Sequence, residues 1–305
     1  MGKVAFVFPG QGAQYPGMGK ALADHSPAAA EVFRQADAAR PGTSEQCFGG
    51  SEEALKDTAT TQPCMFTVEM ATAAALEEAG IHADMAAGFS LGELAALSYG
   101  NVVDISTSLK LVTLRGQLMA QCAAKADTAM AAVLRLSSEE VEQICAQFHD
   151  TYPVNYNCPG QVAVALLRET LPAFTAAVKA AGGRALPLKV GGGFHSPFMA
   201  AAAQEFGEAL QAVPFRTPAI ALYANCTGLP YDGDVKDLLS RQICSPVRWE
   251  EAVRNMIAAG ADTFLEVGPG NTLCGLIKKI DPAVRTFQIS TPEELKQCVQ
   301  EVILC

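Results

Sequence analysis

A single serine stands between two glycines in the segment Gly-Phe-Ser-Leu-Gly, residues 88–92. This G-x-S-x-G spacing is typical of a nucleophile elbow, in which a strand ends, the serine occupies a strained turn and a helix begins. Glycines are needed where the backbone turns sharply or another segment passes very close to it. A plain strand-to-helix turn that buries a small residue is the other interpretation. The pattern therefore makes Ser90 a candidate nucleophile whose partners must come from the rest of the chain.

A serine nucleophile needs a general base, and the chain has only four histidines. His195 follows three glycines and a phenylalanine in Gly-Gly-Gly-Phe-His-Ser-Pro. This loop comes directly after a block of elements that we interpret below as an inserted subdomain, and active sites are common at such junctions. We therefore predict His195 as the base. We interpret His25, His82 and His149 as solvated surface residues, because they lie in polar loops, connections or helix ends.

Acyl transfer also needs two backbone N–H groups that stabilise an oxyanion. In a nucleophile elbow one of them belongs to the residue after the serine, here Leu91. The second usually comes from a glycine-rich loop after an early strand, and the segment 9–12 follows the apolar run 4–8 in this way. A phosphate-binding loop is the alternative for these glycines, but the Lys and Ser/Thr of a Walker sequence are absent.

Arg115 is a candidate for contact with the substrate. It lies three or four residues from Leu111, Val112, Leu118 and Met119 in an expected helix, so it falls on or beside their apolar face. A buried guanidinium must be paired, because an isolated buried charge is costly. Its partner is either a protein carboxylate, in a structural ion pair, or a substrate carboxylate held by the planar fork. The helix alone leaves both interpretations open.

Alternating strand and helix signals along the chain favour a parallel α/β sheet. Strands are expected at residues 4–8, 85–87, 220–225, 263–267 and 284–289. Helices are expected at residues 28–39, 63–80, 91–99, 105–122, 197–213 and 247–259, after the Gly-Pro-Gly segment 268–270, and after Pro292. This arrangement would place the serine turn and the glycine-rich loop at the carboxyl ends of strands, where ligands bind in such sheets.

Between these elements lies a block with a different order, β-α-β-β-α-β, which is typical of a ferredoxin-like fold. Its strands are expected at residues 129–136, 153–157, 162–167 and 184–190, and its helices at residues 138–148 and 171–181. We therefore predict an α/β protein with two parts. An α/β-hydrolase-like large subdomain, residues 1–124 and 196–305, is interrupted by a ferredoxin-like small subdomain, residues 125–195.

Composition excludes several other classes of protein. The chain has 305 residues, of which 50% are hydrophobic, so it can bury a large core. A net charge of -10 argues against nucleic acid as a general partner. No apolar run approaches the ~20 residues needed to span a bilayer, and the first one breaks at Pro9, unlike a signal peptide. The ten cysteines form no C-x-x-C pair, so we expect reduced thiols, a cytoplasmic location, no metal and no cofactor.

Taken together, the motifs resemble those of the malonyl-CoA:acyl carrier protein transacylases of fatty acid synthesis. The similarity covers nearly the whole chain in the family's order. It is carried by FVFPGQGAQYPGMG (6–19), GFSLGELAAL (88–97), LRGQLM (114–119), NYNCPGQV (155–162), GGFHSP (192–197), RQICSPVRW (241–249) and EVGPGNTL (266–273). Several of these motifs are long, so a chance similarity is improbable.

The resemblance implies a role for each matching residue. Ser90 would accept the acyl group and His195 would be its base. Gln11 and Leu91 would supply the oxyanion N–H groups. Arg115 would hold the free carboxylate of the malonyl group.

The resemblance also implies how the base is oriented and how the cleft is lined. The backbone carbonyl of Gln242 would orient His195 in place of a triad aspartate. Asn157 would line the cleft between the subdomains, and Phe194 would crowd a branched α-carbon, which favours malonyl over methylmalonyl. One position departs from the family: Phe89 stands where a histidine usually precedes the nucleophile. That histidine is not the base, so the change concerns the polarity beside the serine.

These observations predict a malonyl-CoA:acyl carrier protein S-malonyltransferase that works by a ping-pong route through a malonyl-serine ester, as a monomer. A trans-acting polyketide acyltransferase and an acyl-thioester hydrolase would use the same Ser/His pair, and an inactive carrier-binding module is a third alternative. An acidic carrier would dock on a local basic patch, for which Lys189, and then Lys278 and Lys279, are candidates. Ordinary solvated lysines are the other interpretation.

Overall fold

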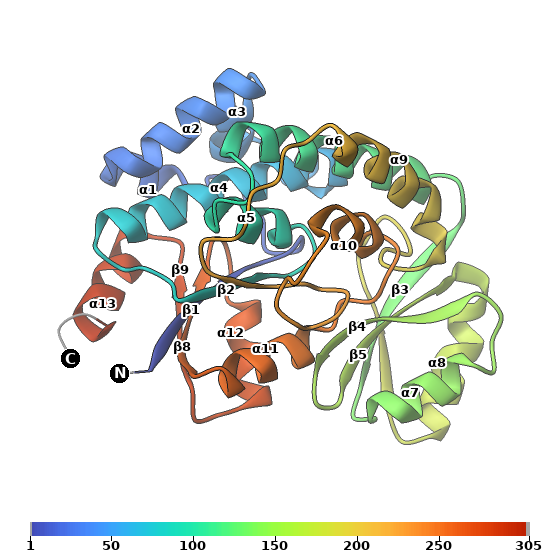
Figure 1. Ribbon diagram of the computed structural model, residues 1–305. Coiled ribbons are helices and arrows are strands. Elements are labelled where there is room, and N and C mark those ends of the chain that lie inside the picture. Colours follow the sequence, from blue (N-terminus) through green and yellow to red (C-terminus); the bar gives the residue numbers. More distant parts are fainter. Residues whose placement is uncertain (1, 303–305) are drawn as a thin grey trace.

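The computed structural model describes residues 2–302, which form two sheets with helices around them (Figure 1). The large sheet has the strand order β7-β2-β1-β8-β9, and every neighbouring pair is parallel. Its strands are β1 (Lys3–Phe8), β2 (Met85–Gly88), β7 (Ala221–Tyr223), β8 (Ala261–Val267) and β9 (Arg285–Ile289). The central strand β1 is buried from Val4 to Phe8, as expected for a parallel strand covered on both faces.

Alternate residues of β1 belong to two different cores. Phe6 and Phe8 pack with α4 (Thr58–Glu78), α5 (Gly92–Tyr99) and α6 (Ile105–Ala123) on one face of the sheet. On the other face, Ala5 and Val7 pack with α11 (Trp249–Ala258) and α12 (Thr272–Ile280). Figure 1 shows these two layers of helices above and below the sheet. The sheet therefore sits in the middle of a three-layer structure, and its strand ends are the places left open for a site.

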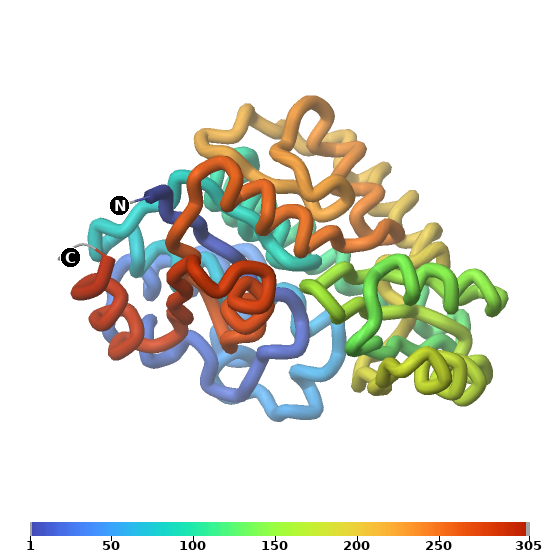
Figure 2. The backbone as a smooth tube through the Cα atoms, turned by 90° about the horizontal axis from the view of Figure 1, so that it is seen from below, coloured from blue at the N-terminus to red at the C-terminus, as the bar shows by residue number. Residues whose placement is uncertain are grey.

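The remaining helices of the large subdomain lie around these layers. They are α1 (Lys20–His25), α2 (Pro27–Ala39), α3 (Thr43–Gly49), α9 (Ala200–Gln211), α10 (Val235–Gln242) and α13 (Pro292–Val302), with short 3₁₀ turns η1 (Ala54–Lys56) and η3 (Pro197–Met199). The start of β1 and the helix α13 lie on the same side of the molecule, away from the small sheet, in both views (Figures 1 and 2).

The small sheet is antiparallel, with the strand order β4-β5-β3-β6. Its strands are β3 (Thr128–Leu134), β4 (Thr151–Cys158), β5 (Gln161–Leu167) and β6 (Arg184–Pro187). The helices α7 (Ser138–Cys145) and α8 (Leu171–Ala180) pack on this sheet and close a separate core, and the 3₁₀ turn η2 (Arg168–Thr170) connects β5 to α8. This order and the β-α-β-β-α-β sequence are those of a ferredoxin-like fold. The predicted fold class is confirmed, while the division at residues 125 and 195 stays a proposal.

A backbone connection joins the two parts of the molecule. Val247 of the large subdomain donates its N–H to the carbonyl of Val154 at 2.8 Å and accepts from the N–H of Tyr156 at 2.9 Å. The residue between them, Asn155, pairs with Val247 as an isolated parallel bridge. β4 is therefore attached to the segment before α11, which fixes one wall of the cleft between the subdomains.

Some predicted boundaries were wrong. The helix expected to begin at Pro63 begins at Thr58, because Asp57 caps it by accepting from the N–H of Ala59. Pro63 therefore lies within the helix. The helix expected to reach residue 148 ends at Cys145, and the strand expected to reach residue 190 ends at Pro187. Three short helices, α1, α3 and α10, were not predicted from the sequence.

Candidate active site

Ser90 occupies a strained turn between β2 and α5. Its φ angle is 55°, in the left-handed region that a non-glycine residue rarely adopts. The flanking glycines are required by close backbone approach: a Cβ on Gly88 would lie 1.9 Å from the backbone of Gly92, and a Cβ on Gly92 would lie 2.3 Å from the carbonyl oxygen of Phe8. This is the geometry of a nucleophile elbow, in which the serine hydroxyl projects from the end of the strand.

His195 meets the serine from the loop that returns from the small sheet. Its Nε2 lies 2.7 Å from Ser90 Oγ, and its Nδ1 lies 2.9 Å from the carbonyl oxygen of Gln242. A carbonyl can only accept, so Nδ1 carries the hydrogen and Nε2 is free to accept the serine proton. Burial, and then the charge of Arg115, lower the pKa of His195 to about 4. The imidazole is therefore neutral at pH 7 and can act as a base.

The guanidinium of Arg115 lies beside this pair, and its side chain is only 1% exposed. Nη1 donates to Gln62 Oε1 at 2.7 Å. Nη2 donates to Gln242 Oε1 at 2.8 Å and to Ser90 Oγ at 3.2 Å. Burial lowers the pKa of Arg115 to about 10, which still leaves it charged at pH 7. All of its hydrogen bonds within the described chain go to uncharged groups, so its cation is available to an incoming carboxylate.

Two amide side chains hold the serine turn in place. Asn225 Oδ1 accepts from the N–H of Ser90 at 2.8 Å, and Asn225 Nδ2 donates to the carbonyl of Gly88 at 2.6 Å. Gln242 Nε2 donates to the carbonyl of Ser90 at 2.6 Å. These bonds satisfy the polar groups of the turn and so offset the strain of its left-handed residue.

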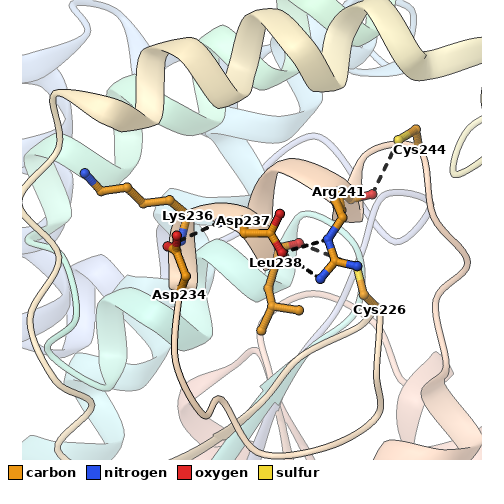
Figure 3. A network of polar contacts seen from close by, with 7 residues as sticks. All are labelled: Cys226, Asp234, Lys236, Asp237, Leu238, Arg241 and Cys244. Atoms are coloured by element: carbon orange, nitrogen blue, oxygen red, sulfur yellow. Dashed lines mark hydrogen bonds and ion pairs between the residues drawn. The ribbon is translucent and has the colours of Figure 1, made fainter.

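Polar contacts within the helix α10, which carries Gln242, and with the loop after β7 stabilise the helix (Figure 3). Arg241 and Asp237 form an ion pair of 2.7 Å along the helix. Cys226, in the loop that follows β7, donates its thiol to the carbonyl of Leu238 at 3.5 Å. The middle of the helix is thus attached at Leu238 to the loop after β7. Gln242, the last residue of the helix, serves the site twice: its carbonyl contacts the histidine, and its amide contacts the arginine and the serine turn.

A cavity of about 130 Å³ opens between these groups. It is lined by Gln11, Gln62, Phe89, Ser90, Leu91, Arg115, Met119, Met130, Asn155, Leu188, Val190, Phe194 and His195. Most of the residues predicted for the site therefore share one cavity. Asn157 lies in an adjoining cavity of about 260 Å³, which Gln11, Phe89, Asn155 and Leu188 also line.

Phe89 fills its position with a hydrophobic contact. Its ring packs edge-on against Trp249, with the ring centroids 5.6 Å apart. It belongs with the core on the α11 side of the large sheet, while it also lines both cavities. The site is therefore less polar next to the serine than a histidine at this position would make it.

The three candidate docking lysines differ in their surroundings. Lys189 is exposed, and its neighbours Leu188 and Val190 line the serine cavity. Lys278 donates to two backbone carbonyls in the loop after α12, those of Pro282 at 3.3 Å and Val284 at 2.5 Å. Lys279 donates to Gln161 Oε1 of the small sheet at 3.3 Å. Lys189 therefore remains the strongest candidate of the three.

The other polar candidates lie away from the cavity. His25, His82 and His149 are exposed. Within residues 2–302, no group of three or more His, Cys, Asp or Glu side chains could hold a metal ion, and all nine cysteines are free thiols. No helix in this range is both long and apolar enough to cross a membrane.

Gln62 and Asn225, which contact the arginine and the serine turn, were not predicted from the sequence. Asn225 follows β7, the strand next to the serine strand, so its place at the carboxyl end of a parallel strand was the available signal. Gln62 offers no local signal, because only the packing of α4 against α6 brings it to the arginine.

Comparison with known proteins places this geometry in a family. The acyl transferase domain model matches residues 5–286. The malonyl CoA-acyl carrier protein transacylase of Bacillus subtilis is 35% identical over 308 residues, which cover 98% of this chain and 97% of that protein. The chain belongs to the malonyl CoA-acyl carrier protein transacylase family.

Other transacylases agree in sequence and in structure. The malonyl CoA-acyl carrier protein transacylase of Escherichia coli K12 is 35% identical over 98% of this chain and 100% of its own length. The crystal structure of the transacylase from Clostridium perfringens is similar with a TM-score of 0.96 at 32% identity, covering 99% of this chain and 98% of that one. The structure of a malonyl-transacylase in complex with a type II PKS acyl-carrier protein is similar with a TM-score of 0.94 at 32% identity. The match covers 98% of this chain and 99% of that one.

Proposed function

We propose that the protein transfers a malonyl group from malonyl-CoA to the phosphopantetheine thiol of an acyl carrier protein in fatty acid synthesis. The observation that carries the proposal is the buried Arg115 cation, whose Nη2 lies 3.2 Å from Ser90 Oγ among uncharged partners. A carboxylate bound there would be close to an acyl group on the serine. The membership of the family, whose relatives are named for this reaction, supports the same conclusion.

In the first half-reaction, Ser90 Oγ attacks the thioester carbonyl carbon of malonyl-CoA. His195 Nε2 accepts the hydroxyl proton as the C–O bond forms. The N–H groups of Gln11 and Leu91 stabilise the oxyanion of the tetrahedral intermediate. The C–S bond then breaks and His195 returns the proton to the CoA sulfur, which leaves a malonyl ester on Ser90.

In the second half-reaction, the thiol of the carrier's phosphopantetheine attacks the ester carbonyl. His195 removes the thiol proton and gives it to Ser90 Oγ as the ester bond breaks. The carbonyl of Gln242 keeps the imidazole in one tautomer through both halves, because it accepts from Nδ1 throughout. A neutral carbonyl does this here in place of a triad carboxylate.

The position of Arg115 selects a short dicarboxylic acyl group. In a malonyl ester a single carbon separates the ester carbonyl from the carboxylate, so the carboxylate stays within a few ångströms of the serine. The planar guanidinium can bind it with two charge-assisted hydrogen bonds. A simple fatty acyl chain would instead meet a buried charge, which argues against a general acyl-thioester hydrolase.

A polyketide carrier is the second candidate acceptor. It is favoured by one observation, the similarity to a malonyl-transacylase solved with a type II PKS acyl-carrier protein. The chemistry at Ser90 would be the same, and only the docking surface would differ. The monomeric state and the cytoplasmic location stay predictions.

The test is to incubate the protein with malonyl-CoA that is labelled in the acyl group, with and without a carrier protein that bears phosphopantetheine. Without the carrier, we expect the label to become attached to the protein. When the carrier is added, we expect the label to move to the carrier. Release of free malonate at the same rate with and without the carrier would identify a hydrolase instead. Parallel reactions with a fatty acid carrier and a polyketide carrier would distinguish the two acceptors.

A further inference from the structure

Glu93 is a buried carboxylate next to the site that the mechanism above does not use. It lies in the first turn of α5, three residues after the serine, and is 1% exposed. Its Oε1 accepts two hydrogen bonds, from the N–H of Asn225 at 3.0 Å and from the hydroxyl of Tyr231 at 2.5 Å. Its Oε2 is buried and has no partner among the described residues. The two oxygens therefore differ: one holds the structure and the other is free to carry a proton.

A short chain of contacts links Glu93 to both the serine and the arginine. Asn225, which donates to Glu93, also accepts from the N–H of Ser90. Gln242 Nε2 contacts Asn225 Oδ1 at 3.3 Å, and Gln242 Oε1 accepts from Arg115. Glu93 and Arg115 also affect each other's charge directly, since each stabilises the ionised form of the other. The carboxylate is thus a protein counter-charge that acts on the arginine, which holds the substrate in the proposed function.

Apart from Arg115, the titratable groups around Glu93 stay neutral near pH 7. Tyr231 and Cys226 come from the loop after β7; burial raises the pKa of Tyr231 well above its usual value and that of Cys226 to about 12. His195, which faces Arg115, has a pKa of about 4. Gln242 from α10 and Asn225 carry no charge. Arg115 from α6 and Glu93 itself are therefore the groups that set the charge of this buried region.

We propose that Glu93 is protonated on Oε2 when a malonyl group occupies the site, taking the missing fraction of a proton from solvent, so that the region never holds more than one carboxylate against Arg115. This inference rests on the proposed function. In the free enzyme, the ionised form of Glu93 balances the charge of Arg115. When the malonyl carboxylate binds, it takes over that charge, and two buried carboxylates near one cation would repel each other. Protonation of Glu93 removes the excess charge.

The geometry allows this change of charge without moving the serine turn. Oε1 keeps its hydrogen bonds from Asn225 and Tyr231 in either state, because the carbonyl oxygen of a carboxylic acid still accepts. Burial raises the pKa of Glu93 to about 7, so the free enzyme is poised between the two forms. Glu93 therefore acts as a positioning and charge-balancing residue rather than as a catalytic one.

The matched variant is Glu93→Gln, whose Oε1 can accept the same two hydrogen bonds and whose amide replaces the protonated oxygen. Proton uptake is measured at pH 7 by calorimetry in buffers of different ionisation enthalpy, while malonyl-CoA acylates the protein without a carrier. The wild type is expected to take up about half a proton more per ester than the variant, because a group with a pKa near 7 is half ionised there. Any proton exchanged by the released CoA thiol is common to both proteins and cancels.

A second readout is the specificity constant for acylation between pH 6 and pH 8. In the wild type, kcat/KM for malonyl-CoA is expected to fall roughly tenfold over this range, because it follows the protonated fraction of Glu93 in the free enzyme. His195 stays neutral throughout, so it contributes no change. For the Glu93→Gln protein, kcat/KM for malonyl-CoA is expected to be independent of pH over this range. For acetyl-CoA, which lacks the carboxylate, kcat/KM is expected to be independent of pH in both proteins.

Equal proton uptake by the two proteins, together with parallel malonyl profiles, would overturn the inference while the malonyl ester still forms. Absence of any malonyl ester in the wild type would instead contradict the proposed function. If Glu93→Gln does not fold, the wild-type comparison of malonyl-CoA with acetyl-CoA decides: identical pH profiles for the two substrates would overturn the inference, and a fall confined to malonyl-CoA would support it.

Discussion

Arg115 donates from Nη2 to Oγ of Ser90 at 3.2 Å, so the buried cation contacts the candidate nucleophile itself. The same nitrogen donates to the amide of Gln242, and the other terminal nitrogen to that of Gln62. A cation whose direct hydrogen-bond partners are neutral amides is oriented without a contact ion pair. This arrangement explains how one small cavity can select a charged acyl group and also keep the serine in place for attack.

Replacement of Arg115 by Ala is expected to lower kcat/KM for malonyl-CoA by about two to three decades, because a charge-assisted contact worth a few kcal/mol is lost. Transfer of an acetyl group, which makes no such contact, should improve relative to malonyl. The measurement is the ratio of the two specificity constants. Lys110→Ala, an exposed change on the same helix, is the control and should leave the ratio unchanged. An unaltered ratio in Arg115→Ala would make the arginine a structural residue.

Gln62→Leu removes the amide that supports Nη1 of Arg115 but leaves the serine, the histidine and Gln242 in place. A buried donor left without a partner costs about 1–3 kcal/mol, so we expect malonyl acylation to slow by roughly ten- to a hundredfold. Acetyl acylation should change little, since Gln62 does not contact the serine or the base. Equal losses for both substrates in stopped-flow acylation would mean that Gln62 supports the whole site rather than the arginine.

The acid limb of kcat/KM is expected near pH 4. His195 must be neutral to accept the serine proton, and burial disfavours its charged form, which lowers its pKa to about 4 from the usual 6.5. Activity should therefore rise as the pH increases through 4 and reach a plateau below pH 6. The profile is measured by pH jumps from neutral stock, with circular dichroism to verify folding. A limb at pH 6.5 would show that the free imidazole is solvated and would contradict the buried geometry.

Glu69 provides a stability test outside the site. Both of its oxygens are buried without a partner among residues 2–302, and burial raises its pKa well above 4.5. The folded state therefore binds the proton more tightly than the unfolded state, so its contribution to stability is complete below about pH 4 and is lost as the pH rises. Glu69→Gln removes this loss. The difference in unfolding free energy between Glu69→Gln and the wild type should grow by up to about 1.4 kcal/mol per pH unit above pH 5.

Urea titrations at pH 5, 6, 7 and 8 measure that difference. Glu266→Gln is the comparison variant, because its carboxylate is also buried but accepts from the N–H of Cys274 at 2.8 Å. The difference in unfolding free energy between Glu266→Gln and the wild type should therefore grow less with pH than the difference for Glu69→Gln. A difference for Glu69→Gln that stays constant from pH 5 to pH 8 would show that this carboxyl group does not stay protonated in the folded protein.

The features that could be predicted from sequence are those that local rules determine. The glycines on either side of Ser90 are required by backbone approach within one turn, and the apolar spacing around Arg115 places it on a buried helix face. The alternation of strands and helices predicted both sheets. In contrast, Gln62 and Asn225 reach the site only because distant elements pack together, and neither stands in a spacing that specifies chemistry.

The predicted boundaries of some helices were wrong for a related reason. The predicted helix begins at Pro63, a residue type that is common at the first position of a helix. The tertiary structure instead starts that helix at the Asp57 cap and accommodates the proline inside it. The short helix α10, which carries Gln242, begins at Val235 and is capped by Asp234, whose side chain accepts from the N–H groups of Lys236 and Asp237. That cap was a readable signal, but the helix is too short for its apolar period to stand out.

The most direct test of the central claim is the intact mass of the protein after a short incubation with malonyl-CoA in the absence of a carrier. The account predicts that the wild type and the exposed-serine control Ser51→Ala gain the mass of one malonyl group, and that peptide mapping places it on Ser90. Ser90→Ala, with an unchanged circular dichroism spectrum, should gain none. A malonyl adduct on Ser90→Ala in the same yield as on the wild type would contradict the account.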